Sequence, residues 1–273
     1  MKTLKQEQMI PKKIHYCWLS GETIPPNFQK CINSWKKIMP DYEIACWDTN
    51  KFDITSNLFV EEACKVKKWA CASDYIRLYA LYTEGGIYMD SDVIVRKKFD
   101  EYLNFDFFTA IEYHTSLVEE EKTLNLLNND GTSKIPFTRK PGIGIQAAVL
   151  GSIKGHFFVK DCLEYFRDKH YVPNDKIIAP DIYAMIAEKY GFRYKNELQH
   201  LNGNILILPS KVFAGTISEA TDNSYAIHYC AGSWRDKPNR SLLKKIFEKL
   251  KKNNHIRKIF WKQPINTIFE DVD

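Results

Sequence analysis

The sequence lacks the features that mark membrane-spanning, secreted or disulfide-rich proteins. No stretch approaches the roughly 18 consecutive apolar residues that a spanning helix needs, and the N-terminal segment contains no apolar core of a secretion signal. The seven cysteines are an odd number in a chain of 273 residues, and none lies at C-x-x-C spacing. This pattern argues against a disulfide framework or a zinc site. We therefore expect a cytoplasmic protein.

Outside the C-terminal end, the sequence has no excess of positive or negative charge. The net charge is +5, but residues 240–262 hold nine Lys or Arg and one Glu, the last eleven residues hold three acids, and residues 1–239 are balanced. A uniformly basic nucleic-acid-binding surface is therefore excluded, and no nucleic-acid partner is expected. The same distribution divides the chain into a main domain, residues 1–239, and a basic tail, residues 240–273.

The basic tail has the pattern of an amphipathic helix over residues 241–252. Two interpretations remain open. The helix lies on an anionic membrane surface through residues 240–262, which would make the protein peripheral at the inner face of the membrane, or it docks on the main domain with its lysines in solvent. The apolar stripe of the helix consists of Leu242, Leu243, Ile246, Phe247 and Leu250.

Strand and helix patterns alternate from the start of the chain. Residues 13–19 (KIHYCWL) are apolar and β-prone, a helix pattern follows a double proline, and residues 42–47 (YEIACW) form a second strand pattern. This order predicts an α/β fold with a parallel sheet. The strongest helix pattern covers residues 70–84, ends at a glycine pair and leads directly into the apolar residues 87–89.

One later segment differs from the rest. Residues 114–140 are polar and show little periodicity, so we expect a long surface excursion there. Long loops in compact domains are often functional, and a substrate lid and a tolerated surface insertion both remain open. Around this segment, strands are predicted at 106–113, 143–152, 204–209 and 225–230, and helices at 155–169 and 180–190.

Two acids, Asp90 and Asp92, follow the apolar residues 87–89 where the chain turns. Ligands of α/β sheets bind beyond the carboxyl ends of the strands, and two carboxylates one residue apart can face one ion there. Their hard oxygen ligands suit Mg²⁺ or Mn²⁺, which neutralises the charge on a departing pyrophosphate group. D-x-D pairs also occur in solvated turns. Apolar residues on both sides of this pair predict burial, where two acids need a partner or an ion.

The acid pair belongs to a longer motif. KIHYCWLSG near the start and WACASDYIRLYALYTEGGIYMDSDV at residues 69–93 resemble glycosyltransferase family 32, and more distantly the clostridial glucosylating toxins. The specific block is S-D-x-x-R-x-x-x-L-x-x-x-G-G-I-Y-x-D-x-D at residues 73–92, and the looser resemblance covers most of residues 10–235. It implies a GT-A fold, with a Rossmann-like mixed sheet and helices on both faces. It also implies a nucleotide-diphosphate-sugar donor, a divalent metal and retention at the anomeric carbon.

The resemblance implies roles for individual residues. Asp92 would bind the metal directly, and Asp90 would bind it through water or hold the ribose and sugar of the donor. Asp74 and Arg77 would contact the donor sugar and phosphate; they lie one helical turn apart, so a plain surface ion pair is the alternative. His228 would complete the metal site as a neutral imidazole, although a lone strand histidine is more often structural.

Other candidates are tied less closely to the motif. Trp18, at the end of the first strand, would stack on the nucleobase as a similarly placed Trp does in the toxins, or it is a core residue. His15 on the same strand is expected to be a satisfied interior histidine. Gln146 stands where many relatives have Asn. Asp181 resembles a family segment beside the sugar, or it complements a helix N-terminus. The remaining donor-binding candidates are Tyr88, Ser91, Ser233 and Trp234.

The resemblance together with these residues implies a retaining, Mn²⁺- or Mg²⁺-dependent hexosyltransferase of surface-polysaccharide biosynthesis, with Asp90, Arg77 and Asp181 as catalytic candidates. The donor would be a nucleotide-diphosphate sugar, with UDP-hexose favoured, and the acceptor a glycan or lipid-linked saccharide. No carboxylate nucleophile is evident, so front-face attack is expected. The alternatives are a haloacid-dehalogenase-type D-x-D phosphatase, whose G-D-x-x-x-D acid pair is not found, a sugar-binding module without activity, and a toxin-like protein glucosyltransferase.

Overall fold

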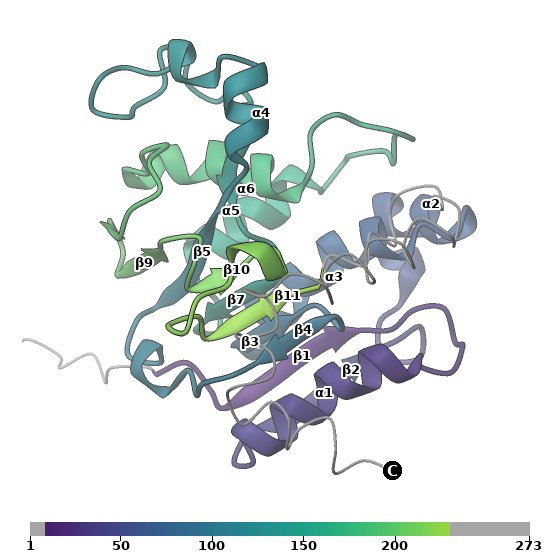
Figure 1. Cartoon of the computed structure of the whole chain (residues 1–273). Coiled ribbons are helices and arrows are strands. Elements are labelled where there is room, and N and C mark those ends of the chain that lie inside the picture. Colours follow the sequence, from purple (N-terminus) through teal and green to yellow (C-terminus); the bar gives the residue numbers. More distant parts are fainter. Residues whose placement is uncertain (1–8, 230–273) are drawn as a thin grey trace, which may run out of the picture.

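The computed structural model describes residues 9–229 as a mixed β-sheet with helices on both faces (Figure 1). The predicted α/β class and the mixed sheet that the resemblance implied are therefore confirmed. The wholly parallel sheet expected from the order of elements is wrong, because β6 (Ile143–Ile145), β7 (Val149–Ser152) and β8 (Gln199–Leu201) pair antiparallel with their neighbours. The predicted helix over residues 241–252 and the end of the strand predicted at 225–230 lie outside the described residues. Among the described residues, no helix combines the length and the apolar character needed to cross a membrane.

The strands of the main sheet lie in the order β2 (Glu43–Trp47), β1 (Lys13–Cys17), β3 (Gly86–Met89), β7 (Val149–Ser152), β5 (Phe107–Tyr113), β9 (Ile205–Leu208) and β8 (Gln199–Leu201), with β6 (Ile143–Ile145) paired to β5. β1 is parallel to β2 and β3, β7 is antiparallel to β3 and β5, and β9 is parallel to β5. The strands β1, β2, β3, β5 and β9 therefore end at the same edge, where α/β sheets bind their ligands.

Helices cover both faces of this sheet because the strand residues alternate between two apolar cores. Tyr88 and Leu150 belong to the core on one face, together with residues of α3, α5 and α6. Ile87, Met89 and Val149 belong to the core on the other face, which α1 covers. The helices are α1 (Pro26–Ile38), α2 (Leu58–Lys65), α3 (Trp69–Glu84), α4 (Thr115–Glu120), α5 (Phe157–Tyr165) and α6 (Ala179–Ala187).

A second, three-stranded sheet lies on the α1 side of the molecule. Its strands are β10 (Phe213–Ala214), β11 (Ala226–His228) and β4 (Val93–Val95), in that order. β11 is parallel to β10 and antiparallel to β4. The chain therefore leaves the main sheet at the end of β3 and enters the small sheet directly after the D-x-D turn, so this turn connects the two sheets.

The end of α3 and the start of β3 depend on a glycine pair. Gly85 ends the helix with φ 68° and donates its N–H to the Leu81 carbonyl. Gly86 has φ 111°, and a Cβ atom there would lie 2.5 Å from the carbonyl oxygen of Lys13. Glycine at both positions thus ends the helix, as the sequence pattern predicted, and lets β3 pair closely with β1.

His15 is the interior histidine that the sequence predicted. It is fully buried, its Nε2 lies 2.8 Å from the Gly85 carbonyl oxygen, and its Nδ1 accepts a hydrogen bond from Trp47 Nε1 at 3.0 Å. Because Nδ1 accepts, Nε2 carries the proton and donates to Gly85. Burial lowers the pKa of His15, so the neutral ring ties β1 to β2 and to the end of α3.

The sequence prediction was incomplete in three places. Residues 114–140 contain α4, a short 3₁₀ helix at Thr123–Leu126 and an isolated bridge between Leu127 and Ser133, so the segment is more regular than expected. Residues 143–152 form two strands, β6 and β7, where one was predicted. The elements α2, β8 and β10 were not predicted.

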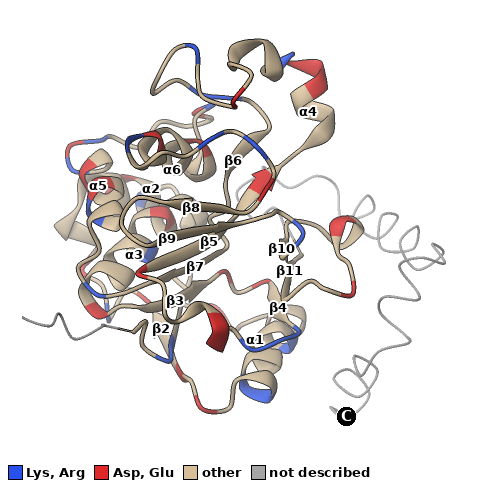
Figure 2. Cartoon of the chain, turned by 90° about the vertical axis from the view of Figure 1, so that its left-hand side faces the viewer, with Lys and Arg blue, Asp and Glu red and all other residues tan. Residues whose placement is uncertain are grey.

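Charges are concentrated in helices and loops, and the central strands carry few of them (Figure 2).

Gly151 on β7 gives a test of core packing. A Cβ atom at Gly151 would lie 2.0 Å from the Phe108 ring, so Gly151→Ala should lower the free energy of unfolding by about 1–3 kcal/mol. Urea unfolding measures the change. Gly215→Ala is the control, because its Cβ would meet only the end of the Glu219 side chain, at 3.3 Å. Equal losses in the two variants would contradict the packing argument.

His156 gives a test by pH. The ring is 2% exposed, is stacked with Phe107, and has no hydrogen-bond partner for Nδ1 among the described residues. Burial lowers the pKa of His156 from its ordinary 6.5. The neutral His156 ring therefore contributes to the free energy of unfolding above about pH 6.5. This contribution is lost as the pH falls through the lowered pKa of the folded state. Between about pH 7.5 and about pH 5, the wild type should lose more free energy of unfolding than His156→Phe. Equal losses of free energy of unfolding in the wild type and in His156→Phe would refute the assignment of this pH dependence to His156.

Candidate functional site

The D-x-D acids lie on a tight turn between β3 and β4. Asp90 donates its backbone N–H to the Ala148 carbonyl on one side, and its own carbonyl accepts from the Val93 N–H. These two bonds fix the turn at the sheet edge predicted to bind ligands. The side chains of Asp90 and Asp92 are 24% and 12% exposed. Asp92 is therefore largely buried as predicted, whereas Asp90 is only half-buried, and both carboxylates benefit from partners there.

His228 reaches the same turn through strand pairing. It lies opposite Val93 in the antiparallel pair of β11 with β4, and the N–H of Tyr229 donates to the Asp92 carbonyl oxygen. The His228 Nε2 atom lies 3.1 Å from Asp92 Oδ1 and 3.7 Å from Asp90 Oδ2. The tertiary structure thus brings together the three residues that the sequence analysis proposed as metal ligands.

These three side chains fit a divalent cation. One ligand atom from each of Asp90, Asp92 and His228 can be chosen so that all three lie within 4.8 Å of one another. Two carboxylate oxygens and an imidazole nitrogen suit Mn²⁺, and carboxylate oxygens also suit Mg²⁺. The group has few protein ligands, which leaves coordination positions for water or phosphate oxygens.

Arg77 lies beneath the acid pair and faces into the protein. Its side chain is 5% exposed. Nη1 donates to the Ala147 carbonyl at 2.6 Å and Nε to the Ser73 carbonyl at 3.2 Å. Nη2 lies 2.8 Å from Asp74 Oδ1, 3.2 Å from Ser73 Oγ and 3.6 Å from Asp90 Oδ1. The Asp74–Arg77 pair of the motif is therefore formed, but it is buried and not the surface pair that the sequence left open.

Tyr88 connects this arginine to the D-x-D turn. The Tyr88 hydroxyl donates to Asp90 Oδ1 at 2.8 Å, and the Arg77 guanidinium lies over the Tyr88 ring at 4.8 Å from its centre. Burial raises the pKa of Tyr88, so its hydroxyl keeps its proton. Burial also raises the pKa of Asp74 to about 6, against the opposing effect of Arg77. Asp90 thus accepts a hydrogen bond from a neutral hydroxyl and lies near the charge of Arg77, while Asp74 has Arg77 as its main counter-charge.

Two further donor-binding candidates lie at the same sheet edge. Trp18 directly follows β1, is half-buried, and donates its ring N–H to the Glu22 carbonyl at 2.6 Å, with its ring edge to face with Phe28. Ser91 lies between the two acids and is half-buried. The indole of Trp18 is therefore partly accessible, which a core residue would not be and a base-stacking residue requires.

Gln146 and Asp181 have partners of their own. Gln146 is 2% exposed and donates Nε2 to the Phe213 carbonyl at 2.7 Å, which joins the end of β6 to β10. Asp181 is 6% exposed in the first turn of α6 and accepts from Arg139 Nε at 3.0 Å and from the Ile178 N–H at 3.2 Å. Burial raises the pKa of Asp181. Its contacts match the helix N-terminus role, and its catalytic role stays a prediction.

The sequence analysis did not single out two residues of this region. Ser73 supplies two acceptors to Arg77, and its position in the S-D-x-x-R motif was the available signal. Tyr183 is a buried tyrosine on α6, two residues after Asp181, without any signal in the local pattern. The candidates Ser233 and Trp234 lie outside the described residues.

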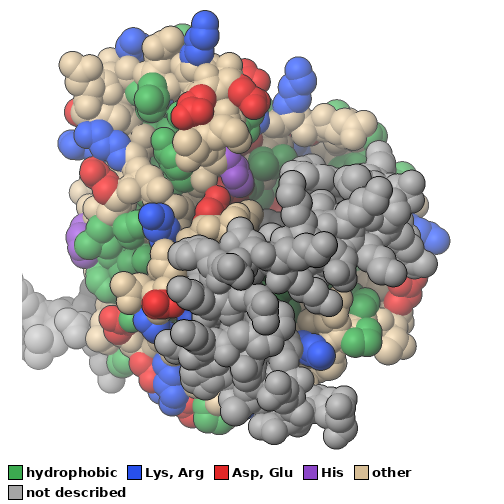
Figure 3. All heavy atoms as spheres, viewed as in Figure 1, with side chains coloured by type: hydrophobic (Ala, Val, Ile, Leu, Met, Phe, Trp, Pro, Cys, Tyr) green, Lys and Arg blue, Asp and Glu red, His purple; other side chains and the backbone are tan. Residues whose placement is uncertain are grey.

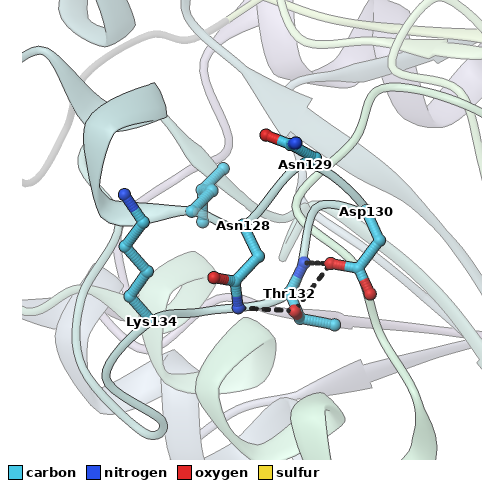
Figure 4. A pocket seen from close by; sticks show the side chains of 6 residues that line it. Asn128, Asn129, Asp130, Thr132 and Lys134 are labelled. Atoms are coloured by element: carbon cyan, nitrogen blue, oxygen red, sulfur yellow. Dashed lines mark hydrogen bonds between the residues drawn. The ribbon is translucent and has the colours of Figure 1, made fainter.

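On the face drawn in Figure 3, acidic and basic side chains of the described residues are interspersed. A pocket of about 530 Å³ lies in the 114–140 excursion (Figure 4). Three of its polar side chains are paired with each other: Asn128 donates to Thr132, and Thr132 donates to Asp130. No predicted site residue lines that pocket.

Comparison with known proteins finds the D-x-D motif within a segment that matches a known family model. Residues 25–109 match the family model of a glycosyltransferase sugar-binding region containing a DXD motif. The match includes Asp74, Arg77, Asp90 and Asp92. Residues 25–109 are therefore similar to the DXD sugar-binding region of these glycosyltransferases, in agreement with the resemblance to family 32.

Individual relatives carry glycosyltransferase names. "Uncharacterized glycosyltransferase L373" of Acanthamoeba polyphaga mimivirus is 33% identical over 106 residues, covering 37% of this chain and 42% of the viral protein. Inositol phosphoceramide mannosyltransferase 1 of Schizosaccharomyces pombe is 25% identical over 155 residues, 47% of each chain. The matches span less than half of both relatives. The solved PaToxG glycosyltransferase has 19% identity and a TM-score of 0.46, covering 67% of this chain and 70% of its own.

The buried position of Arg77 gives a prediction. Arg77→Lys should lower the free energy of unfolding by about 2–4 kcal/mol, because an ammonium group cannot replace the guanidinium fork that bonds Ala147, Ser73 and Asp74 together. Arg167→Lys is the matched control, since Arg167 is 66% exposed and pairs with Glu164 on the surface; it should change stability by less than about 0.5 kcal/mol. Chemical unfolding measures both. Equal stability of the Arg77→Lys and Arg167→Lys variants would contradict the structural role.

Proposed function

We propose that this chain is a divalent-cation-dependent glycosyltransferase that moves a hexose from a nucleotide-diphosphate sugar to a saccharide acceptor. The observation that carries the proposal is the convergence of Asp90, Asp92 and His228 from two distant segments at the ligand-binding edge of the sheet. The DXD sugar-binding region in residues 25–109 supports sugar transfer over the phosphatase alternative.

A Mn²⁺ or Mg²⁺ ion at this site would supply positive charge to a diphosphate leaving group. Asp92 and His228 would hold it most directly, since their side chains already meet at 3.1 Å. Asp90 is shared between this site and the hydroxyl of Tyr88, which fixes the direction of its carboxylate. Arg77 Nη2 lies 3.6 Å from Asp90 Oδ1 and places positive charge beside this carboxylate. The protein thus orients Asp90 before a donor arrives.

The donor would lie along the carboxyl edge of β1 and β3. Trp18 would stack on the nucleobase, and Ser91 and Asp90 would contact the ribose or sugar. Asp74 would contact the hexose, and Gln146, Ser233 and Trp234 complete the proposed set. UDP-glucose or UDP-galactose is the favoured donor, with GDP-mannose as the alternative.

Transfer would proceed with retention by front-face attack. The bond between the anomeric carbon and the diphosphate oxygen breaks, and the acceptor oxygen bonds the same face of that carbon. The hydroxyl proton of the acceptor passes to the departing diphosphate oxygen. Orientation of the substrates and electrostatic stabilisation of the leaving group would then account for the rate of transfer, because no nucleophilic side chain is required.

The acceptor is proposed to be a glycan or a lipid-linked saccharide of a surface polysaccharide. The Schizosaccharomyces pombe relative is named for transfer of mannose to inositol phosphoceramide, which favours a lipid-linked class. Attachment to a membrane through residues 240–262 remains part of this proposal only, because those residues lie outside the described part of the chain.

Hydrolysis of the donor tests the proposal without knowledge of the acceptor. A panel of nucleotide sugars is incubated with the protein and Mn²⁺, and release of the nucleoside diphosphate is measured. We expect hydrolysis of one donor that EDTA abolishes and added Mn²⁺ restores. Asp92→Asn should lower this rate by roughly 100-fold or more while the unfolding curve keeps its shape. Asp168→Asn, at an exposed position, should keep the wild-type rate. Full activity of the Asp92→Asn protein, or activity unaffected by EDTA, refutes the metal site.

A further inference from the structure

The described part of the chain contains a pocket outside the D-x-D site. Its volume of about 530 Å³ lies within the range of ligand pockets. The lining comes from a single segment of the excursion, residues 127–134 (Figure 4). The residues that line it are Leu127, Asn128, Asn129, Asp130, Thr132 and Lys134. The proposed donor contacts lie elsewhere, along β1 and β3, so this pocket is available for another ligand.

The backbone holds this segment in one shape. The Asn128 N–H donates to the Thr132 carbonyl, and the Gly131 N–H donates to the Asn128 carbonyl, both at 2.9 Å. Outside the segment, the Tyr194 N–H donates to the Gly131 carbonyl at 2.8 Å, and a Cβ atom at Gly131 would lie 2.8 Å from the Lys195 side chain. The tip of the loop is therefore fixed against the body of the protein, and a ligand would not have to order it.

The polar side chains of the pocket combine donors and acceptors. Asp130 Oδ1 accepts from the Thr132 N–H at 3.0 Å and from the Thr132 hydroxyl at 2.7 Å. Asn128 Nδ2 donates to the same hydroxyl at 3.0 Å. These bonds orient Asp130 and Asn128 but use only part of their hydrogen-bonding capacity. Among the described residues, the side chain of Asn129 has no hydrogen bond, so its amide offers two N–H donors and a carbonyl acceptor.

This lining suits an uncharged ligand that is rich in hydroxyl groups. Each hydroxyl of a sugar is both a donor and an acceptor, so adjacent amides and a carboxylate can bond neighbouring hydroxyls. The charges of Asp130 and Lys134 cancel, which disfavours a diphosphate or a nucleotide compared with a neutral hexose. Leu127 adds an apolar part to the lining, as ligand pockets commonly have. The chemistry of the lining thus matches a saccharide.

The excursion projects from the end of β5 (Figure 1). β5 ends at the same sheet edge as β1 and β3, and the chain returns from the excursion into β6. The base of the excursion is tied to α6: Arg139 Nε lies 3.0 Å from Asp181 Oδ2, and the Phe137 N–H donates to Glu188 Oε2 at 2.9 Å. The excursion with its pocket is therefore anchored at the ligand-binding edge, outside the D-x-D site itself.

We propose that this pocket is an acceptor subsite, which binds a neutral hexose unit of an oligosaccharide away from the hydroxyl that receives the transferred sugar. The inference rests on the proposed function and narrows its acceptor to an oligosaccharide. The pocket and the D-x-D site share no residue, so only an extended ligand spans both. The pocket lies outside residues 25–109, the segment that matches the family model, and it gives the excursion a role other than that of a lid or a tolerated insertion.

Saccharide binding tests the pocket without knowledge of the natural acceptor. Linear tetrasaccharides of glucose, galactose or mannose, in α and β linkage, are titrated into the protein, and the Kd is measured by saturation-transfer NMR on the saccharide protons. The wild type should bind at least one of them. Asn129→Ala should weaken this binding about tenfold, because it removes the hydrogen bonds of the free amide. Asn125→Ala is the matched control and should keep the wild-type Kd, since Asn125 is an exposed asparagine of the same excursion that does not line the pocket.

The tetrasaccharide that binds is then offered as the acceptor, with the donor that the hydrolysis panel identifies. We expect transfer of the hexose to it. Asn129→Ala should raise the KM for the tetrasaccharide about tenfold and change kcat little, because the pocket holds a part of the acceptor that does not react.

Four results would overturn the inference. If the wild type binds none of the tetrasaccharides, the pocket is not a saccharide site. If Asn129→Ala and Asn125→Ala have equal Kd values, the saccharide binds elsewhere. A lower midpoint of urea unfolding for Asn129→Ala than for Asn125→Ala means that the amide serves the fold. A tetrasaccharide that binds in the pocket but accepts no sugar refutes the acceptor role.

Failure of the proposed function gives a different result. In that case the wild type hydrolyses no nucleotide sugar, whatever it does with the tetrasaccharides. The Kd values of the wild type and the two asparagine variants still decide whether the pocket is a saccharide site, because their measurement needs no donor.

Discussion

The antiparallel pairing of β4 with β11 is the constraint on which the site depends. β4 begins directly after the D-x-D turn, so its partner strand determines which side chain stands beside the two acids. The register places His228 opposite Val93, and the Tyr229 N–H fixes the Asp92 carbonyl. Because the chain leaves the main sheet at this turn, the acids lie between two sheets and are largely shielded from water. Their charges therefore interact more strongly than they would on an open edge.

A buried arginine completes this arrangement from the other side. Arg77 bonds the Ala147 carbonyl next to β7, its own helix at Ser73, and the acid Asp74. It thus links α3 to the main sheet and at the same time supplies positive charge beneath Asp90. Such a guanidinium is costly to bury unless all its donors are satisfied, and here each nitrogen has a partner. The site is therefore preorganised, which is the property that electrostatic catalysis requires.

The functional residues divide into two groups along the chain. Asp74, Arg77, Asp90 and Asp92 lie within residues 25–109, the segment that matches the glycosyltransferase sugar-binding region. His228 lies beyond it and reaches the site through the small sheet. The later half of the chain thus completes a site whose first half is defined by the motif.

The sequence by itself determined the elements whose signals are local. Apolar spacing and the glycine pair predicted α3 and its end, and the D-x-D block predicted the acids at a strand end and the i,i+3 pair of Asp74 with Arg77. Only the tertiary structure decided that Arg77 is buried, that residues 143–152 form two strands, and that His228 stands beside Asp92. Periodicity encodes contacts within a few residues. The pairing of distant strands depends on packing across the whole core, which no local pattern contains.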